Sequence, residues 1–248
     1  MKLVGIQIGK KGINETQIRS TSRMDGYHLA KRIFDLVFTI AILPFLIPLM
    51  VIIAVAIKLD SPGPVFFVQT RVGARYQKGQ KKSSWIRRDF NFYKFRSMFI
   101  NSDAAIHKEY VQALIRNDEE KMASIQGCET NIRKILHDPR ITRVGRFIRK
   151  FSLDELPQFL NVLKGDMSLV GPRPALAYEV DLYKPWQLER LHAMPGITGL
   201  QQVTARCTAS FDQQVKFDLD YINHQSFFLD LIILCKTPFA VLQSRGAR

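Results

Sequence analysis

The longest hydrophobic stretch of the chain covers residues 36–57, where 22 consecutive positions carry no charged side chain. A straight α-helix of that length is about 33 Å long, close to the thickness of the hydrocarbon core of a bilayer. A helix of this length in the core of a globular domain normally shows a polar stripe, and this stretch shows none. The pattern therefore predicts a membrane-embedded helix.

The form of this helix follows from two prolines and from the charge of its flanks. Pro44 and Pro48 each remove a backbone donor in the middle of the stretch. Basic side chains stand on both sides of it, with Lys31 and Arg32 before and Lys58 after. Because basic residues favour the cytoplasmic side, a spanning helix would place one flank on the wrong side. A re-entrant helix, broken at the prolines, satisfies both flanks and is favoured over a kinked spanning helix.

The remaining pattern predicts two short extended segments, at residues 65–68 and 91–95, with an exposed basic loop at 71–88 between them. Helical patterns dominate the rest of the chain. They cover residues 102–126, 143–151, 153–163, 175–192 with a break at Pro185, 211–223 and 227–242, with a loop at 165–174 and a turn at 195–199.

These elements predict an α+β fold that is mostly helical. A polar basic segment covers residues 1–30, the re-entrant membrane helix lies in 31–60, and a single domain on the cytoplasmic face covers 61–248. The last helix, 227–242, is apolar enough to lie on the membrane as an interfacial helix. Packing under the domain as a core helix is the alternative.

The charge balance narrows the class of partner. The 248 residues include 36 Lys and Arg against 22 Asp and Glu, a formal net charge of +14. Such an excess indicates polyanionic partners, which are nucleic acid, anionic lipid or phosphorylated substrates. The chain lacks a helix-turn-helix signature, an RNP-type aromatic pattern and zinc-ligand spacing, so we expect no nucleic acid. Three scattered cysteines argue against a disulfide framework.

Two adjacent carboxylates, Asp154 and Glu155, are the first candidates for chemistry. Ser152 and Glu155 have the spacing of a capping box, which predicts a helix that opens at Ser152. Acidic residues at helix starts are commonly structural, because they complement the helix dipole. In a functional interpretation one carboxylate attacks phosphorus and the other binds a metal, since consecutive helical side chains point about 100° apart.

Candidate phosphate ligands surround these carboxylates in the sequence. Residues 140–150 carry five cations, of which Arg149 comes close before Asp154. Arg173 stands between two prolines, which lower the entropy cost of a rigid phosphate clamp. Lys94 and Arg96 alternate along an extended segment, so we expect both on one face. A solvated or lipid-binding surface is the alternative for the basic cluster at 140–150.

Taken together, these segments resemble the bacterial polyprenyl-phosphate sugar 1-phosphate transferases, also called monotopic phosphoglycosyltransferases. The resemblance covers residues 31–245, in the family's order. Its motifs are KRIFD at 31–35, GPVFF at 63–67 with Gln69 and Arg71, KFRSM at 94–98, SLDELPQ at 152–158, NVLKGDMS at 161–168, GPRP at 171–174 and PGITG at 195–199.

The resemblance implies an enzyme that moves a sugar 1-phosphate from a UDP-sugar to polyprenyl (undecaprenyl) phosphate. Asp154 would form a covalent intermediate with the phosphosugar, and Glu155 would assist. Mg²⁺ is the implied cofactor, with Asp154 and Glu155 as its ligands. The implied phosphate-binding residues are Lys94, Arg96, Arg149, Arg173 and Arg206.

The resemblance also implies a place in the cell. Such a chain lies on the cytoplasmic face of the bacterial inner membrane, as a monotopic protein in contact with membrane lipid, and forms a homodimer in one possible arrangement. It initiates the assembly of exopolysaccharide, O-antigen, capsule or another glycan. Its membrane helix is broken at a proline, which points to Pro48 here. A non-enzymatic membrane adaptor with a basic lipid-binding surface is the alternative, and it leaves Asp154, Glu155 and the Arg173 loop unexplained.

Three features depart from the family pattern. Ile47 precedes Pro48 where a serine is common, so a serine-assisted kink is absent. Residues 75–88 and 101–136 are longer than in minimal members. Ala205 precedes Arg206 where glycine is common, which puts a nucleotide contact by Arg206 in question.

Overall fold

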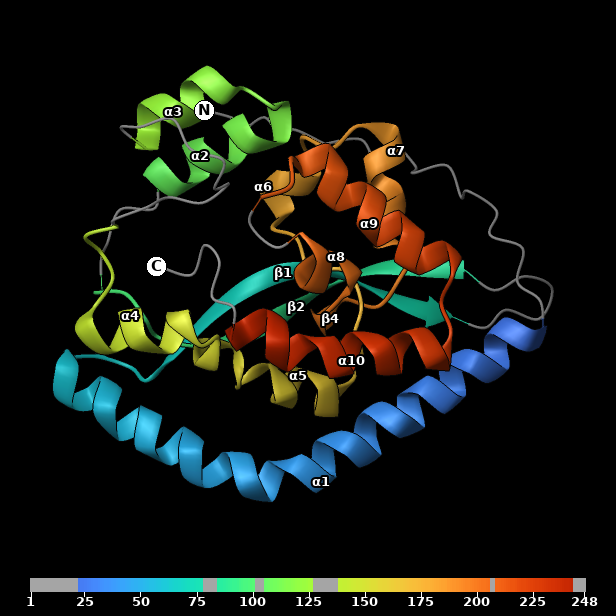
Figure 1. The fold of residues 1–248 in the computed structure, drawn as a ribbon, viewed down its shortest axis with the longest axis horizontal. Coiled ribbons are helices and arrows are strands. Elements are labelled where there is room, and N and C mark those ends of the chain that lie inside the picture. Colours follow the sequence, from blue (N-terminus) through green and yellow to red (C-terminus); the bar gives the residue numbers. More distant parts are fainter. Residues whose placement is uncertain (1–21, 78–83, 101–104, 127–137, 206–207, 243–248) are drawn as a thin grey trace, which may run out of the picture.

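The computed structural model describes residues 22–77, 84–100, 105–126, 138–205 and 208–242, with the side chains of residues 22–25 left out. Helix α1 (Ser22–Asp60) runs along one whole side of the molecule (Figure 1). It is long and apolar enough to cross a membrane, and only 11% of its most apolar window is buried. This exposure contradicts a core helix and agrees with the predicted membrane-embedded helix.

α1 continues through Pro44 and Pro48 and bends in its middle, so that both ends rise toward the body of the protein (Figure 1). The expected break at Pro48 is thus a bend in an uninterrupted helix. Each proline removes only its own donor, to the carbonyl four residues earlier, and the remaining helical hydrogen bonds hold the segment together.

The longest strands form an antiparallel hairpin, β1 (Phe66–Gln77) and β2 (Ser84–Phe95), paired from Phe66 with Phe95 to Gln77 with Ser84. The prediction of an exposed loop over 71–88 is therefore wrong for the described part of that range. The frequent arginines there conceal three consecutive buried positions, Val72, Gly73 and Ala74. Consecutive buried positions lack the alternation of a half-buried strand, so the pattern did not indicate β1.

A second, two-stranded sheet pairs β3 (Ser168–Val170) with β4 (Gly196–Thr198) in parallel. These residues were expected as a loop and a turn, which is wrong. Three residues are too few to show a period, and parallel partners lie far apart in the sequence. The crossover between them holds α6 (Ala177–Val180), α7 (Pro185–Leu188) and the 3₁₀ turn η2 (Glu189–Leu191).

The predicted helical segments are largely confirmed. The region 102–126 holds α2 (Ala105–Arg116) and α3 (Glu119–Gln126), and α4 (Arg143–Lys150) begins after its N-cap Thr142. The helix expected at 153–163 consists of a 3₁₀ turn, η1 (Leu153–Glu155), and α5 (Gln158–Lys164). The chain closes with α8 (Leu200–Thr204), α9 (Phe211–Asn223) and α10 (Phe227–Leu242).

In the view of Figure 1, the hairpin crosses the middle of the molecule, with α1, α5 and α10 on one side and α2, α6, α7 and α9 on the other. The largest hydrophobic core cluster of the described residues joins Phe90 and Phe92 of β2 to Val162, Tyr221 and Ile233 of α5, α9 and α10. α10 therefore packs under the domain with one face, and its contact with a membrane stays a prediction. Ile233 and Asp230 are buried, while Phe228, Phe239 and Leu242 are exposed.

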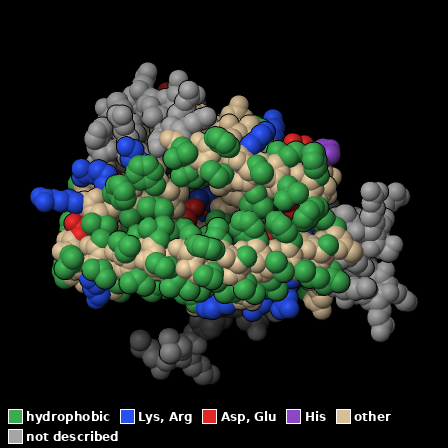
Figure 2. Space-filling model, turned by 60° about the horizontal axis from the view of Figure 1, so that its bottom comes forward, with side chains coloured by type: hydrophobic (Ala, Val, Ile, Leu, Met, Phe, Trp, Pro, Cys, Tyr) green, Lys and Arg blue, Asp and Glu red, His purple; other side chains and the backbone are tan. Residues whose placement is uncertain are grey.

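α1 and α10 are joined on their inner faces. Lys31 Nζ lies 2.7 Å from the buried Asp230 carboxylate, and the rings of Phe34 and Phe227 are 5.0 Å apart. On its outer face α1 exposes a band of hydrophobic side chains, visible as a belt across the front of Figure 2.

Candidate active site

A tight turn after α4 places the two carboxylates. Ser152 has a left-handed backbone (φ 55°), and its side chain makes no capping hydrogen bond. The predicted capping box is therefore wrong. The chain turns directly after α4, where Ser152 N donates to the Arg149 carbonyl at 3.2 Å, and the positive φ of Ser152 stands at the position where a cap would need extended backbone. Asp154 and Glu155 follow in η1, which packs against β2.

Both carboxylates contact one ammonium group from β2. Lys94 Nζ lies 2.7 Å from Glu155 Oε1 and 3.6 Å from Asp154 Oδ2. Arg173 Nη1 donates to the same Glu155 oxygen at 3.3 Å. Consecutive side chains on a helix were expected to point about 100° apart, and the two carboxylates nevertheless reach one atom, because the chain here is a single 3₁₀ turn beside a strand. The structure brings together Asp154, Glu155, Lys94 and Arg173 from three separate segments.

The cluster is electrostatically asymmetric. Burial raises the pKa of Asp154, the negative charge of Glu155 adds to this, and the cations Lys94, Arg149 and Arg173 oppose it. Burial also acts to raise the pKa of Glu155, but Lys94 and Arg173 hold that pKa well below its usual range. Glu155 is therefore the carboxylate that stays ionised. Asp154 is paired less closely, since Lys94 Nζ lies 3.6 Å from its Oδ2.

Arg149 joins this cluster through its charge. Burial lowers its pKa, and Asp154 acts in the opposite direction. Its position on the last turn of α4 results from the packing of that helix. Gly145 lies so close to the Ser97 carbonyl group that a Cβ there would overlap it, and Ile148 is buried.

Arg96 does not join the cluster. Its guanidinium is buried against the end of α1, where it donates to the Ser61 carbonyl (2.7 Å), the Ser61 hydroxyl (2.9 Å) and the Pro62 carbonyl. Lys94 and Arg96 were expected to share one face, but their side chains contact different groups: Lys94 contacts the carboxylates, and Arg96 contacts the end of α1. The structure gives Arg96 the role of closing the junction between α1 and β1. Arg206 lies outside the described residues, and Pro48 lies within α1, apart from this cluster.

Arg71 is a member of this region that sequence reasoning did not select as a site residue. It donates to the Pro174 carbonyl (3.1 Å) and the Gln69 side chain (2.9 Å), and its guanidinium lies 5.3 Å from the centre of the Phe92 ring. Burial and the charge of Arg173 lower its pKa to about 10. The register of the hairpin would have indicated Arg71 as a site residue, because it places Arg71 and Lys94 on the same face.

The carboxylates offer only part of a metal site. Among the described residues, no group of three or more His, Cys, Asp and Glu side chains lies close enough together to hold an ion. Two adjacent carboxylates nevertheless suit Mg²⁺, which takes one or two protein carboxylates and completes its shell with water and substrate phosphate oxygens. The residues therefore fit a metal that binds together with a phosphorylated substrate.

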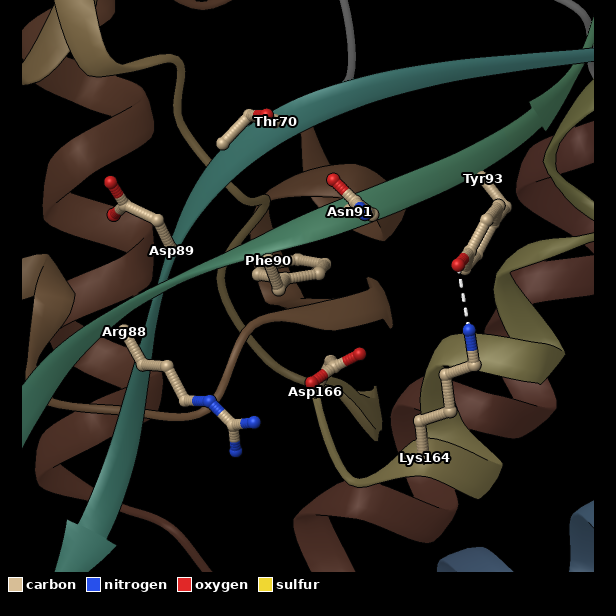
Figure 3. A pocket seen from close by; sticks show the side chains of 8 residues that line it. All are labelled: Thr70, Arg88, Asp89, Phe90, Asn91, Tyr93, Lys164 and Asp166. Carbon is tan, nitrogen blue, oxygen red and sulfur yellow. Dashed lines mark hydrogen bonds between the residues drawn. The ribbon is translucent and has the colours of Figure 1, made fainter.

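Figure 2 shows acidic and basic side chains at the bottom of a hollow beside the hydrophobic belt. A separate pocket lies at the outer edge of β2, where Lys164 Nζ donates to the Tyr93 hydroxyl at 2.6 Å (Figure 3). Lys164 and Asp166 line it together with Arg88 and Asp89, so its charges balance. It contains neither Asp154 nor Glu155.

The chain is similar in sequence to several known proteins. The chain is 43% identical over 217 residues to an undecaprenyl-phosphate galactose phosphotransferase of Salmonella typhimurium, covering 88% of this chain and 41% of that protein. It is 39% identical over 242 residues to a UDP-N-acetylgalactosamine-undecaprenyl-phosphate N-acetylgalactosaminephosphotransferase of Aeromonas hydrophila, covering 95% and 49%. The exopolysaccharide production protein ExoY of Rhizobium meliloti is 37% identical over 219 residues, 88% of each chain.

The chain thus spans less than half of the length of the first two relatives and most of the third. The family described as bacterial sugar transferase matches residues 26–244. This match includes most of α1, the hairpin, the carboxylate pair and α10, and the chain therefore belongs to the bacterial sugar transferase family.

Proposed function

We propose that this protein transfers a sugar 1-phosphate from a UDP-sugar to polyprenyl phosphate at the cytoplasmic face of the bacterial inner membrane. The observation that carries the proposal is the cluster of Asp154 and Glu155 with Lys94 and Arg173, in a molecule with an exposed apolar helix along one side. The names of the relatives, which include an exopolysaccharide production protein, support a role in starting glycan assembly.

The reaction proceeds in two displacements. An oxygen of Asp154 attacks the phosphorus that carries the sugar, and the bond from that phosphorus to the bridging oxygen breaks, which releases uridine monophosphate. An oxygen of the polyprenyl phosphate then attacks the same phosphorus and expels the Asp154 carboxylate. Covalent catalysis by a carboxylate divides one difficult transfer into two easier ones.

The neighbouring residues supply charge and orientation. Arg173, Arg149 and Lys94 face the carboxylates and would neutralise the diphosphate, whose charge increases on the leaving phosphate. Arg173 suits this role, because 46% of its side chain is exposed while Glu155 already orients it. Asp154 and Glu155 would hold Mg²⁺ together with the diphosphate oxygens, where the ion would stabilise negative charge.

The apolar surfaces suit a lipid acceptor. α1 would enter and leave the membrane by one face, and its bend in Figure 1 supports this re-entrant form. The exposed Phe228 and Phe239 of α10 would lie in the interface beside it. A polyprenyl phosphate could then remain in the bilayer while its phosphate reaches the charged hollow.

The test is release of uridine monophosphate from a panel of UDP-sugars, with full-length protein in detergent or nanodiscs, Mg²⁺ and undecaprenyl phosphate. Wild-type protein should release the nucleotide with at least one donor, and Asp154→Asn should lower the rate by a factor on the order of 10⁴ or more, because the nucleophile is lost. Asp220→Asn, an exposed carboxylate on α9, is the matched control and should behave as wild type.

The same experiment separates the proposal from its rivals. Equal rates for wild type and Asp154→Asn would show that Asp154 is not the nucleophile. No release from any donor would favour the non-enzymatic adaptor. If chelation of Mg²⁺ left the wild-type rate unchanged, the metal assignment would be wrong.

A further inference from the structure

The loop that carries Arg173, residues 171–175, is held at every position. We call it the Arg173 loop. Three of its residues are fixed by backbone hydrogen bonds of 2.8–2.9 Å: Gly171 to Thr198, Pro172 to Gly196 and Ala175 to Val72. The carbonyl groups of Arg173 and Pro174 between them face two arginine side chains, Arg190 and Arg71.

Arg190 reaches the loop from η2. Its Nη2 lies 3.5 Å from the Arg173 carbonyl oxygen and 2.6 Å from Asp218 Oδ2. Its Nη1 donates to the Tyr183 hydroxyl at 3.2 Å, and its guanidinium lies 5.7 Å from the ring centres of both Tyr183 and Phe211. Only 8% of the Arg190 side chain and 3% of the Asp218 side chain are exposed.

We propose that Arg190 and Asp218 form a buried positioning pair that fixes the backbone of Arg173, so that its side chain is held at Glu155. This inference rests on the proposed function, in which Arg173 binds the diphosphate of the donor. A buried ion pair adds little net stability, because desolvation offsets the attraction of the charges. The ion pair instead fixes a position, because the rings of Tyr183 and Phe211 and the Asp218 carboxylate together confine the Arg190 guanidinium beside the loop.

The pair also has a pH signature. Burial raises the pKa of Asp218 to about 6, although Arg190 acts to lower it. The other ionisable groups that face the pair are Tyr183 and Glu179, from the crossover around α6. Above pH 6, Asp218 is ionised and holds Arg190. Below pH 6 it takes up a proton, so Arg190 loses its counter-charge and the grip on the loop weakens.

A double-mutant cycle tests the proposal, with uridine monophosphate release by the full chain as the readout. Asp218→Asn mimics the protonated state and should lower kcat/KM by about 10- to 100-fold, the size expected when a phosphate ligand is displaced by about 1 Å. In an Arg173→Ala background the same substitution should have no further effect, because the pair acts through Arg173. Asp220→Asn, two residues along α9, is the matched control and should leave both backgrounds unchanged.

Two further measurements keep the test informative if Asp218→Asn folds poorly. Tyr183→Phe removes only the hydroxyl acceptor of Arg190 and should give a smaller loss that also vanishes in the Arg173→Ala background. Beyond the loss caused by protonation of Asp154, the wild-type rate should fall as the pH drops through 6, and this additional fall should be absent from both Asp218→Asn and Arg173→Ala.

Equal losses in both backgrounds would reveal a general structural role and overturn the proposal, as would unchanged activity of Asp218→Asn. Absence of release by the wild type is a different result, because it overturns the proposed function itself.

Discussion

At the scale of single residues, the site depends on how one lysine shares its charge. Lys94 lies against both Asp154 and Glu155, and 16% of its side chain is exposed, so water screens the interaction only in part. Without its charge both carboxylates would bind protons more tightly. For Asp154 this would add to the effect of burial, which already raises its pKa.

Replacement of Lys94 by methionine should therefore lower kcat by about 10²- to 10³-fold, the usual loss when one charge-stabilising donor is removed. The acid side of the pH–rate profile should move to higher pH, because the nucleophile must be ionised to attack. Lys164→Met is the matched control, since Lys164 bonds Tyr93 in the separate pocket of Figure 3. A profile that moved to lower pH would contradict this account of the cluster.

Arg96 illustrates a residue whose role depends on its partners. Its donors reach Ser61 and Pro62 at the end of α1, and only 6% of the residue is exposed. Arg96→Gln should lower the free energy of unfolding by about 1.5–3 kcal/mol, the size of hydrogen bonds that involve a charged group. The KM for the UDP-sugar should stay unchanged, whereas Arg173→Gln should raise it. Thermal denaturation and donor titrations measure both effects, and a raised KM for Arg96→Gln would restore it as a phosphate ligand.

At the scale of secondary-structure elements, close backbone contact positions α4. Helix α4 carries Arg149, and its Gly145 rests on the backbone of Ser97 directly after β2. The N-cap Thr142 accepts from Gly145 N at 2.9 Å, and Val144 N donates to Asp60 at the end of α1 at 3.0 Å. Membrane helix, strand and basic helix therefore meet at one junction.

Gly145→Ala should accordingly lower the free energy of unfolding by about 1–3 kcal/mol, because a methyl group there overlaps a carbonyl that cannot move alone. Gly26→Ala on α1 is the control, because nothing lies within 4 Å of a Cβ at that position. It should stabilise the helix by about 0.5–1 kcal/mol. Thermal unfolding in one detergent compares the two, and equal shifts in the same direction would contradict the close contact.

At the scale of the whole molecule, the charged hollow and the apolar surface lie next to each other (Figure 2). α1 leaves Leu29 and Leu59, near its two ends, 64% and 84% exposed. Helix bending brings both ends toward the domain, which is the arrangement that a re-entrant anchor requires (Figure 1).

The re-entrant form can be tested with single cysteines at Leu29 and Leu59, in a chain whose Cys235 and other native cysteines are replaced. Both cysteines should react with a membrane-impermeant maleimide in inside-out vesicles, and neither should react in right-side-out vesicles. Replacement of Pro44 and Pro48 by alanine should restore the two missing donors, straighten α1 and favour a spanning form. One of the two cysteines should then change sides. Reaction of the two cysteines from opposite sides in the wild type would contradict the re-entrant helix.

The sequence alone determined what depends on neighbouring residues. The uncharged stretch 36–57 was enough to predict the exposed helix α1, and helical periodicity located α9 and α10. The motif around Asp154 and Glu155 selected the two carboxylates that the structure brings together with Lys94 and Arg173. These features could be predicted because hydrophobic period, caps and motifs are local.

Tertiary structure decided what depends on residues far apart. The β1–β2 hairpin was hidden by its arginines, and the β3–β4 pair joins strands separated by a crossover. Arg71 donates to the Pro174 carbonyl across 103 positions of the sequence. Arg96 was expected to bind phosphate, and in the structure it binds the chain at the end of α1. A single chain shows which charges are present, but only packing decides which of them face one another, because burial and partner geometry arise when distant segments come into contact.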